Sequence, residues 1–554
     1  MRRAVAIAAL LLFPVLASAA TERYVVALKG GGPALRGALL LRDIDSSIGP
    51  RERAVASFRN LDAFAADLTE SEVAALRLSP GVRYVEPVAE RRILGFPGAP
   101  ATDASRNVDG QTIPAGVDTV RAREVWAVTR GEAANVVVID TGVDYRHPDL
   151  ASVWAGGFNA ITQSADPMDD HSHGTHVSGT IAAADNDFGV VGVAPRVRLW
   201  GVKALRADGG GTSDRVIAGI DWVIGQKKAL GGNWIINLSL GAARQVVAER
   251  EAIARAVNEG ILVVAASGNE STSALPAPVS FPAAYPGVLA IGAVDGQLQH
   301  ASFSNRGPEL GAVAPGVDIL SSVRTGTGSL SAVLSAEVNY VGAGLAGSPR
   351  GTVSGPFTFC GVGREQDFTA AVAGRIAVIR RGGEITFALK AKRAKAAGAT
   401  AVVIVNHDSS PLNFTLLDPN DPTSSSFDWP VTIALSNADG DHLIASSTPA
   451  ITVKNVNDDY ESNTGTSMAA PHAAGVAALA WSVAPAATAA EVRNALIMQA
   501  TDLGAPGFDT LYGHGLLNAL ESAKMLNPAA FGSPSTPPSD PEPSGRRILR
   551  RGRG

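Results

Sequence analysis

Four apolar residues followed by an acid form the most informative stretch of this chain, Val136-Val137-Val138-Ile139-Asp140-Thr141-Gly142. A short continuous apolar run is typical of a strand buried on both faces, as the strands of parallel sheets are. Asp140 stands at the carboxyl end of the run, where open α/β sheets place their functional groups. Further runs of this kind lie at residues 199–204, 234–238, 261–266 and 288–294. Because helical segments such as residues 213–228 separate them, we predict an α/β fold with a parallel sheet flanked by helices.

The composition is that of an ordinary globular protein. The chain has 554 residues, of which 46% are hydrophobic and 18% charged, and its formal net charge is −5. At about 150 residues per domain, this length predicts three or four structural units. The slight negative charge gives no basic surface of the kind that binds nucleic acid, so we expect no such partner. Cys360 is the single cysteine, which excludes an intramolecular disulfide.

The N-terminus has the pattern of an export signal. Arg2 and Arg3 precede a short apolar run, and Ala17-Ser18-Ala19 suits a signal peptidase. We therefore expect the protein to be secreted, either outside the cell or into a periplasm. Beyond the N-terminus no apolar stretch is long enough to span a bilayer, so we expect no transmembrane segment.

Changes of pattern along the chain predict its domains. A helix that starts at the capping box of Thr69 and Glu72 lies between two strands and indicates a small α+β unit, and residues 91–110 lack periodicity and suggest a linker. The rhythm of strands and helices changes again at residues 326–458, which indicates an inserted domain. The predicted boundaries are 1–19 for a signal peptide, 20–110 for the α+β unit with its linker, 111–527 for the α/β domain, 326–458 for the insert and 528–554 for a disordered tail rich in Pro, Ser and Arg.

Three more stretches carry groups that suit catalysis. They are His171-Ser172-His173-Gly174-Thr175-His176, Ala266-Ser267-Gly268-Asn269 and Gly465-Thr466-Ser467-Met468-Ala469-Ala470-Pro471-His472. A serine at a helix N-terminus has backbone N–H groups free beside it, and an asparagine after a buried strand can donate to a developing oxyanion. The histidines also allow a zinc cluster, although the stretch lacks the glutamate base that accompanies zinc histidines on a helix. Taken alone, each stretch is compatible with an ordinary turn or cap.

The motifs are more specific together than apart. The order Asp140, His173, Ser467 is one of the three orders in which Ser-His-Asp triads occur. On these motifs the chain resembles the subtilisin-like serine proteases (subtilases), over about residues 110–325 and 458–525. The resemblance implies an endopeptidase in which Ser467 is the nucleophile, His173 is the general base and acid, and Asp140 orients His173.

The same resemblance implies a substrate cleft. Asn269 and the backbone N–H of Ser467 would form the oxyanion hole. A peptide would lie extended along one segment, and small residues would line the pocket for the side chain before the scissile bond. The residues implied are Ser239, Leu240 and Gly241 for the strand and Ala266, Ser267, Gly268 and Ser280 for the pocket. Small uncharged walls imply broad specificity, with a preference for large apolar or aromatic residues at that position.

A structural calcium ion is implied as well. Its ligands would be Gln111, Asp149 and Asn186 through their side chains and Ala184, Phe188 and Val190 through their carbonyls. All of these are oxygen donors, which calcium prefers. The alternative is an ordinary polar loop without an ion.

The flanking units extend the resemblance. Residues 20–110 resemble the ferredoxin-like inhibitory propeptide of the family, which acts as an intramolecular chaperone and inhibitor until it is cut near Arg91-Arg92, near Gly110, or in stages. The insert resembles a protease-associated (PA) domain, on its stretch from Gly374 to Gly398. The chain is thus expected to be a self-processing zymogen and a monomer that acts on protein or peptide substrates.

Two other hypotheses remain open at this stage. A catalytically inactive member of the fold would bind peptides or act in adhesion through the same cleft. The arginines of the tail, Arg546 to Arg553, would suit a surface-binding role on an anionic polymer or membrane.

Overall fold

The computed structural model describes residues 20–30, 54–97, 110–408, 410, 412, 414–417 and 423–532. The predicted signal peptide and all of the predicted tail beyond residue 532 lie outside this range. No helix within these residues has the length and apolar character needed to cross a membrane.

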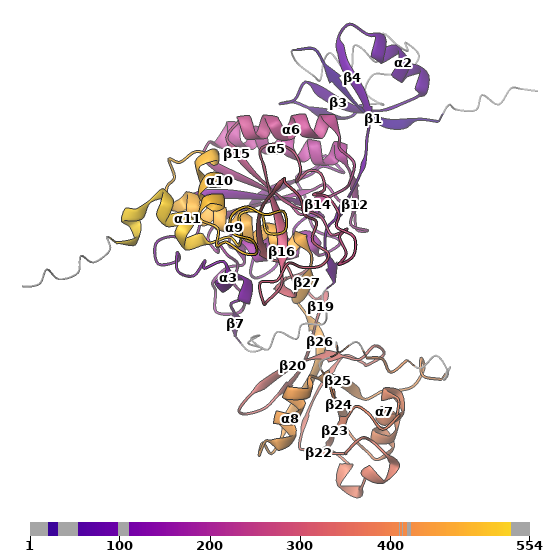
Figure 1. Ribbon diagram of the computed structural model, residues 1–554. Coiled ribbons are helices and arrows are strands. Elements are labelled where there is room, and N and C mark those ends of the chain that lie inside the picture. Colours follow the sequence, from indigo (N-terminus) through magenta and orange to yellow (C-terminus); the bar gives the residue numbers. More distant parts are fainter. Residues whose placement is uncertain are drawn as a thin grey trace, which may run out of the picture.

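A seven-stranded sheet forms the centre of the molecule, and all its strands are parallel (Figure 1). Its strand order is β17-β16-β15-β13-β8-β11-β9. The bounds are β8 Ala134–Asp140, β9 Trp154–Asn159, β11 Arg198–Lys203, β13 Asn233–Leu238, β15 Ile261–Ala266, β16 Val288–Val294 and β17 Leu310–Pro315. The predicted parallel α/β sheet is therefore confirmed, and each apolar run of the sequence is one of its strands.

Helices cover both faces of this sheet because its strands alternate between two apolar cores. Val136 and Val138 face the core that includes α4 (His173–Ala182) and α9 (Thr466–Val483), together with α10 (Ala489–Met498) and α11 (Ala519–Leu526). Val137 and Ile139 face the core of α5 (Ser213–Leu230) and α6 (Val247–Asn258). The carboxyl ends of the strands thus meet the N-termini of α4 and α9, the two helices that carry His173 and Ser467.

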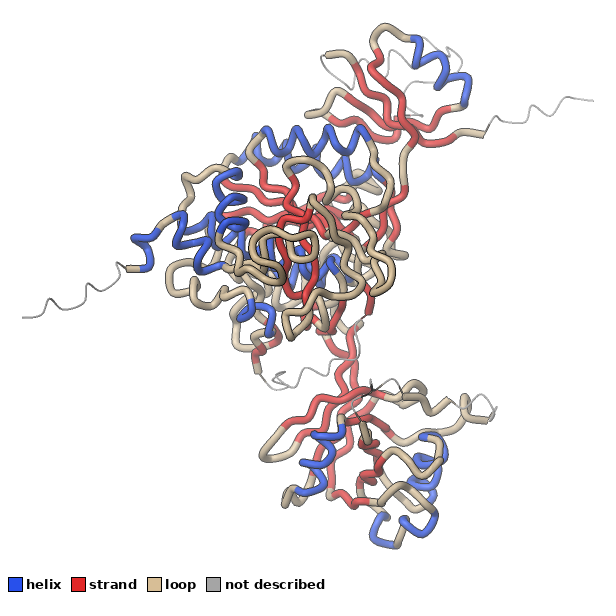
Figure 2. Tube along the Cα trace, in the orientation of Figure 1, coloured by secondary structure: helices blue, strands red, loops and turns tan. Residues whose placement is uncertain are grey.

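The N-terminal unit is a four-stranded antiparallel sheet with the order β2-β3-β1-β4. Its elements are β1 Glu22–Leu28, β2 Ala54–Phe58, β3 Ala63–Leu68, α2 Glu70–Leu78 and β4 Val82–Pro87. The capping box that begins α2 is formed as expected. Figure 2 shows this sheet lying over the blue pair of helices α5 and α6.

The expectation of a linker from residue 91 is wrong for its first residues. β5 (Glu90–Ile93) lies between β12 (Gly210–Thr212) and β14 (Leu240–Gly241), antiparallel to both. β6 (Phe96–Pro97) pairs with β27 (Tyr460–Thr464), whose other edge holds β18 (Ile319–Ser322). The sequence of this segment has no apolar alternation that would predict a strand. Its strands form because they pair with strands of the larger domain.

The insert is a separate body between β18 and β27, on the opposite side of the central sheet from the N-terminal unit (Figure 1). Its eight-stranded sheet has the order β21-β26-β19-β20-β25-β24-β23-β22, with its own apolar cores. The bounds are β19 Gly328–Leu334, β20 Asn339–Gly344, β21 Gly351–Gly355, β22 Phe357–Phe359, β23 Ile376–Arg380, α7 Phe387–Ala396, β24 Ala401–Val405, β25 Val431–Leu435, α8 Asn437–Ala445 and β26 Ile451–Asp458. Shorter elements of the larger domain are β7 Gln111–Thr112, α3 Ala115–Thr119 and β10 Gly189–Val190.

Candidate active site

Asp140 and His173 meet at the carboxyl end of β8. Nδ1 of His173 lies 2.8 Å from Oδ1 of Asp140, and both side chains are buried. Oδ1 of Asp140 also accepts a hydrogen bond of 2.7 Å from the backbone N–H of Thr141, which fixes the carboxylate. Nε2 of His173 has no hydrogen-bond partner among the described residues. A histidine held in this way offers Nε2 for proton transfer.

Ser467 lies in the first turn of α9, which begins at Thr466. Its hydroxyl donates to the carbonyl of Ser239 (2.8 Å) and accepts from the backbone N–H of Leu94 (3.0 Å). The ring of Pro471 leaves the carbonyl of Ser467 without its usual helical donor four residues on, and the hydroxyl of Ser239 donates to it instead at 2.9 Å. The proline thus allows the start of the helix to be tied to the neighbouring strand.

The carbonyl oxygen of Leu94 occupies a site with two donors. Nδ2 of Asn269 donates to it at 2.7 Å, and the backbone N–H of Ser467 donates at 3.0 Å. These distances are those expected of donors to an oxyanion. Gly465 allows the approach, because a Cβ atom there would lie 2.4 Å from this oxygen.

The amide of Asn269 is oriented by its other end. Oδ1 accepts from both the backbone N–H (3.0 Å) and the hydroxyl (2.8 Å) of Thr466. Because only the amide oxygen can accept, Nδ2 must face Leu94.

The peptide bond after Leu94 lies between these groups. A Cβ atom on Gly95 would be 3.0 Å from Nε2 of His173, so the nitrogen side of this bond lies beside the imidazole. The carbonyl side lies beside Ser467 and Asn269. The structure therefore holds residues 90–97 as a peptide laid through the site, with the Leu94–Gly95 bond at its centre.

The residues predicted for the substrate cleft surround this segment. Gly241 pairs with Arg92 and Leu240 with Ile93, as expected for a strand against which a peptide lies. Leu94 is 5% exposed and belongs to the same apolar cluster as Ala266. A Cβ atom on Gly241 would lie 2.9 Å from Cδ1 of Leu94, so the leucine packs directly against the backbone on this side.

The far end of the predicted pocket is a polar network rather than an open wall. Ser280 donates to Oε2 of Glu270 at 3.2 Å, and Asn305 donates to the same atom. Gly268 has a φ of +116°, and a Cβ atom there would clash with Asn305 at 2.2 Å. Ser267 is buried, and its hydroxyl lacks a hydrogen-bond partner among the described residues.

His176 and His472 lie nearby but are not suited to proton transfer. Burial lowers the pKa of His176 to about 3 and that of His472 to about 4. His176 bonds to the carbonyls of Ile319 and Glu461, and His472 to that of Met468. Both are neutral at ordinary pH, which leaves His173 as the histidine placed to act on the Leu94–Gly95 bond.

The zinc alternative for the histidines receives no support from the geometry. Within the described part of the chain, no group of three or more His, Cys, Asp or Glu side chains is arranged to hold a metal ion. This statement does not cover sites whose ligands are backbone carbonyl and side-chain amide oxygens.

The predicted calcium ligands do converge. Nε2 of Gln111 lies 2.9 Å from the carbonyl of Ala184, 3.0 Å from Oδ1 of Asn186 and 3.0 Å from the carbonyl of Phe188. An amide nitrogen has two hydrogens and cannot satisfy three acceptors fully. Asp149 is adjacent, since Oδ1 accepts from Asn186 at 3.1 Å and Oδ2 from the backbone N–H of Val190 at 3.0 Å.

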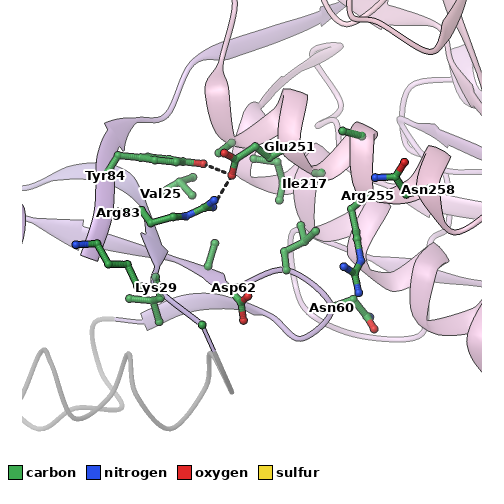
Figure 3. A pocket seen from close by; sticks show the side chains of 17 residues that line it. Val25, Lys29, Asn60, Asp62, Arg83, Tyr84, Ile217, Glu251, Arg255 and Asn258 are labelled. Atoms are coloured by element: carbon green, nitrogen blue, oxygen red, sulfur yellow. Dashed lines mark hydrogen bonds and ion pairs between the residues drawn. The ribbon is translucent and has the colours of Figure 1, made fainter. Parts of the chain in front are cut away.

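The N-terminal unit holds the larger domain through charged groups on α5 and α6. Figure 3 shows Arg83 and Tyr84 pointing toward Glu251 of α6, to which they donate at 2.6 and 2.8 Å. The carboxylate of Glu86 accepts from the first N–H groups of α6, at 3.0 Å each. A helix N-terminus favours an anion there. These contacts place the N-terminal unit so that β5 enters the cleft.

Sequence reasoning missed the functional residues at the junction. Leu94 and Gly95 lie in the site without belonging to a recognisable motif, and Arg91, considered from the sequence only as part of a processing position, is buried against Glu249. The sequence offered one indirect signal for these residues, which is that a segment directly after a propeptide-like unit is expected to pass through the cleft. Which residue of the segment lies at Ser467 follows only from the strand pairing in the structure.

Comparison with known proteins agrees with the geometry. The sequence model of the subtilase family matches residues 131–344 and 392–515, and that of the peptidase inhibitor I9 family matches residues 38–93. Subtilisin E of Bacillus subtilis (strain 168) is 36% identical over 312 residues, which cover 56% of this chain and 75% of that protein.

Solved structures give the same result. The psychrophilic subtilisin-like protease Apa1 of Pseudoalteromonas sp. AS-11 matches with a TM-score of 0.57 and 30% identity, covering 76% of this chain and 100% of that one. Fervidolysin of Fervidobacterium pennivorans matches with a TM-score of 0.58 over 91% of this chain and 61% of its own, and its 21% identity supports the fold alone.

Proposed function

The chain belongs to the subtilase family and is a subtilisin-like serine endopeptidase with an I9 propeptide domain, and we propose that Asp140, His173 and Ser467 carry out its reaction. The observation that carries the proposal is the Leu94 carbonyl, which accepts from both Asn269 and the N–H of Ser467. A carbonyl between two such donors is polarised for attack.

The first chemical step joins Ser467 to the carbonyl carbon. Its hydroxyl turns from the Ser239 carbonyl toward Nε2 of His173, which takes the proton as Oγ attacks. Asp140 holds Nδ1–H of His173, so that Nε2 presents its lone pair and the imidazolium that forms is stabilised. The charge that develops on the carbonyl oxygen is held by Asn269 and the N–H of Ser467.

The second step breaks the bond to the leaving amine. Nε2 of His173 gives its proton to the nitrogen of Gly95, beside which it lies, and the C–N bond breaks to leave an acyl-enzyme on Ser467. Water, deprotonated by the same nitrogen, then hydrolyses the ester. The same sequence of steps acts on a substrate in trans once the first segment has left.

The arrangement of residues 90–97 supports a zymogen that cuts itself between Leu94 and Gly95. The N-terminal unit then acts as chaperone and inhibitor, because its contacts with α5 and α6 keep β5 in the cleft after cleavage. Of the sites considered from the sequence, Arg91-Arg92 and Gly110 both lie away from the two donors.

The first maturation cut is expected at Leu94–Gly95. Time-resolved intact mass of the purified protein should show a fragment that ends at Leu94 as the first N-terminal product, whatever later trimming removes. The matured chain should take one adduct of a fluorophosphonate serine probe. A first fragment that ends at Arg92 or Gly110 would contradict the assigned register, and a folded protein that takes no probe would favour the inactive peptide-binding alternative.

We further propose an apolar preference for the residue before the scissile bond. Leu94 is buried in an apolar cluster, and its side chain lies directly against the backbone of Gly241. A medium apolar side chain such as leucine therefore suits the pocket better than the large aromatic residues that the sequence also allowed.

A calcium ion is proposed at the loop of residues 184–190. Three oxygens converge on Nε2 of Gln111, and exchanging the two ends of that amide would present Oε1 to an ion among them. The Asp149 carboxylate adds a negative charge. This donor set fits calcium, which would tie β7 and β10 to the core without taking part in the chemistry.

Calcium removal is expected to lower thermal stability. When the free calcium concentration is 100 times the dissociation constant, binding stabilises the folded state by about 2.7 kcal/mol. The Tm should therefore rise with added calcium and fall when a chelator is added. Asp149→Asn should abolish the calcium-dependent part, whereas Asp187→Asn, whose side chain is outside the donor set, should retain it. A Tm that is independent of calcium in the wild-type protein would remove the proposed site.

The remaining parts of the proposal rest mainly on the sequence. Residues 1–19 act as a signal peptide that directs secretion, the insert at residues 326–458 acts as a PA domain that shapes access to the cleft, and the mature enzyme is a monomer. The insert leaves and rejoins the larger domain beside Ser172, since Thr327 lies within hydrogen-bond distance of its hydroxyl at 3.1 Å. That junction adjoins the start of α4, which supports a role of the insert near the site.

A further inference from the structure

A buried ion pair lies three residues before the Leu94–Gly95 bond. Nε of Arg91 donates to Oε1 of Glu249 at 2.9 Å, and one terminal nitrogen donates to Oε2 at 2.6 Å. Both side chains are fully buried. The pair is bidentate, the geometry in which a guanidinium recognises a carboxylate most specifically.

The register fixes which residue of a substrate would occupy this place. Leu94 is the residue before the scissile bond, so Arg91 is the fourth residue counted back from it, the P4 residue. Exposure along β5 agrees with this, because Arg91 and Leu94 are buried whereas Arg92 is exposed. The larger domain therefore reads the first and fourth residues of the peptide and leaves the third to solvent.

Glu249 is held in place by the larger domain itself. It lies in the first turn of α6, where the helix dipole favours a carboxylate, and Tyr285 donates to its Oε2 at 3.1 Å. Tyr285 is fixed in turn by the backbone of Val246, whose N–H donates to its hydroxyl at 2.8 Å and whose carbonyl, at 3.0 Å, shares the single hydroxyl hydrogen with Glu249. None of these partners belongs to the N-terminal unit, so the carboxylate stays aimed at the cleft after that unit is released.

Two further N–H groups of Arg91 are also used. One terminal nitrogen donates to the carbonyl of Glu90 at 2.8 Å, and the other donates to that of Arg244 at 3.3 Å, in addition to Glu249. The carbonyl of Arg244 comes from the larger domain and adds a second acceptor on the enzyme side. A lysine would offer one point charge and could not form the same fork.

We propose that Glu249 is a specificity-determining residue that selects arginine at P4, so that the enzyme prefers protein or peptide segments of the form Arg-X-X-Leu before the cut. The inference rests on the proposed function, because it needs the peptide register of the proposed reaction. An apolar P4 side chain would leave the Glu249 carboxylate buried without its cationic partner, which is strongly unfavourable. The Arg91 of the chain is then a built-in copy of the preferred substrate.

The test compares peptides on the matured wild-type enzyme. Internally quenched peptides carry the sequence of residues 90–97 with Arg91 kept or replaced by Lys, Gln or Leu, and kcat/KM is measured for each. The arginine peptide should exceed the leucine peptide by about 10²-fold, the size expected when a buried charge loses its partner. Lysine should fall between them, and a matched peptide with Arg92→Leu should differ little from the parent, because that side chain is exposed.

A variant of the enzyme tests the same pairing from the other side. In Glu249→Leu the preference should reverse, with the leucine peptide cut faster than the arginine peptide. If Glu249→Leu fails to mature, the double variant Arg91→Leu with Glu249→Leu should restore maturation, since two apolar residues of similar volume replace the pair.

The outcomes separate this inference from the proposed function. Equal kcat/KM values for the parent peptide and the Arg91→Leu peptide, from an enzyme that takes the fluorophosphonate probe, would overturn the role of Glu249 and leave the protease intact. Failure of probe labelling and of all peptide cleavage would overturn the proposed function itself. A Glu249→Leu enzyme that keeps the arginine preference would also overturn the inference.

Discussion

Ser467→Ala is expected to leave the chain uncut at Leu94–Gly95 and to abolish probe labelling. The hydroxyl of Ser467 lies 3.0 Å from the backbone nitrogen of Leu94, and Asn269 and the N–H of Ser467 hold the carbonyl oxygen of the same residue. In subtilisin, a member of the same family, loss of the nucleophile lowers kcat by about 10⁶-fold. With a rate lower by that factor, self-cleavage should not be detected during the experiment.

The fold should survive this substitution. Ser467 is buried, and alanine removes its hydrogen bonds to Ser239 and Leu94 without adding volume. Intact mass over time gives the readout, with Ser522→Ala as the matched control, a buried serine on α11 whose hydroxyl donates to the carbonyl of Ala495 on α10. A Ser467→Ala chain that still releases a fragment ending at Leu94, at a rate independent of protein concentration, would show that another group performs the cut.

The uncut Ser467→Ala chain also gives a way to examine the zymogen directly. Its N-terminal unit should remain bound, with Glu86 of β4 at the N-terminus of α6 and Arg83 at Glu251 of α6, and with β5 between β12 and β14. Protection of these elements from hydrogen exchange would follow, because the paired backbone of residues 90–93 is buried in the cleft.

The sequence was sufficient for the central sheet because its signal is local. Each buried strand is a continuous apolar run, and parallel strands between helices leave few topologies to choose from. The helix at residues 213–228 ends at Gly231 as its pattern indicates, and α2 begins at its capping box. Such boundaries depend on neighbouring residues, which a single sequence contains.

The cleft could be predicted only in part, for the opposite reason. Asp140, His173, Asn269 and Ser467 belong to motifs, and the structure brings them to one edge of the sheet. Arg91 and Glu249 are 158 positions apart, and two charged residues in polar surroundings ordinarily indicate solvent-exposed side chains. Their burial depends on the register of β5, which is fixed by long-range pairing and by the docking of the N-terminal unit.

Asp140→Asn is the second substitution for which we expect a large loss. Oδ1 of Asp140 accepts from the backbone N–H of Thr141 at 2.7 Å and lies 2.8 Å from Nδ1 of His173. An asparagine whose oxygen takes the place of Oδ1 keeps both contacts, but its amide carries no negative charge. The imidazolium that forms when His173 takes the proton of Ser467 then lacks its anionic partner, which slows the attack.

The expected size of this loss is about 10⁴-fold in the rate of self-cleavage, the effect of the same change in a serine protease triad. The rate is measured by intact mass under single-turnover conditions, together with the rate of fluorophosphonate labelling. Asp144→Asn, another buried carboxylate that bonds to a turn and to Thr325, serves as control and should stay close to wild type. Because asparagine preserves the volume and the bond to Thr141, the Tm should change little. A variant that cuts itself at a near wild-type rate would mean that the negative charge of Asp140 does not stabilise the imidazolium of His173.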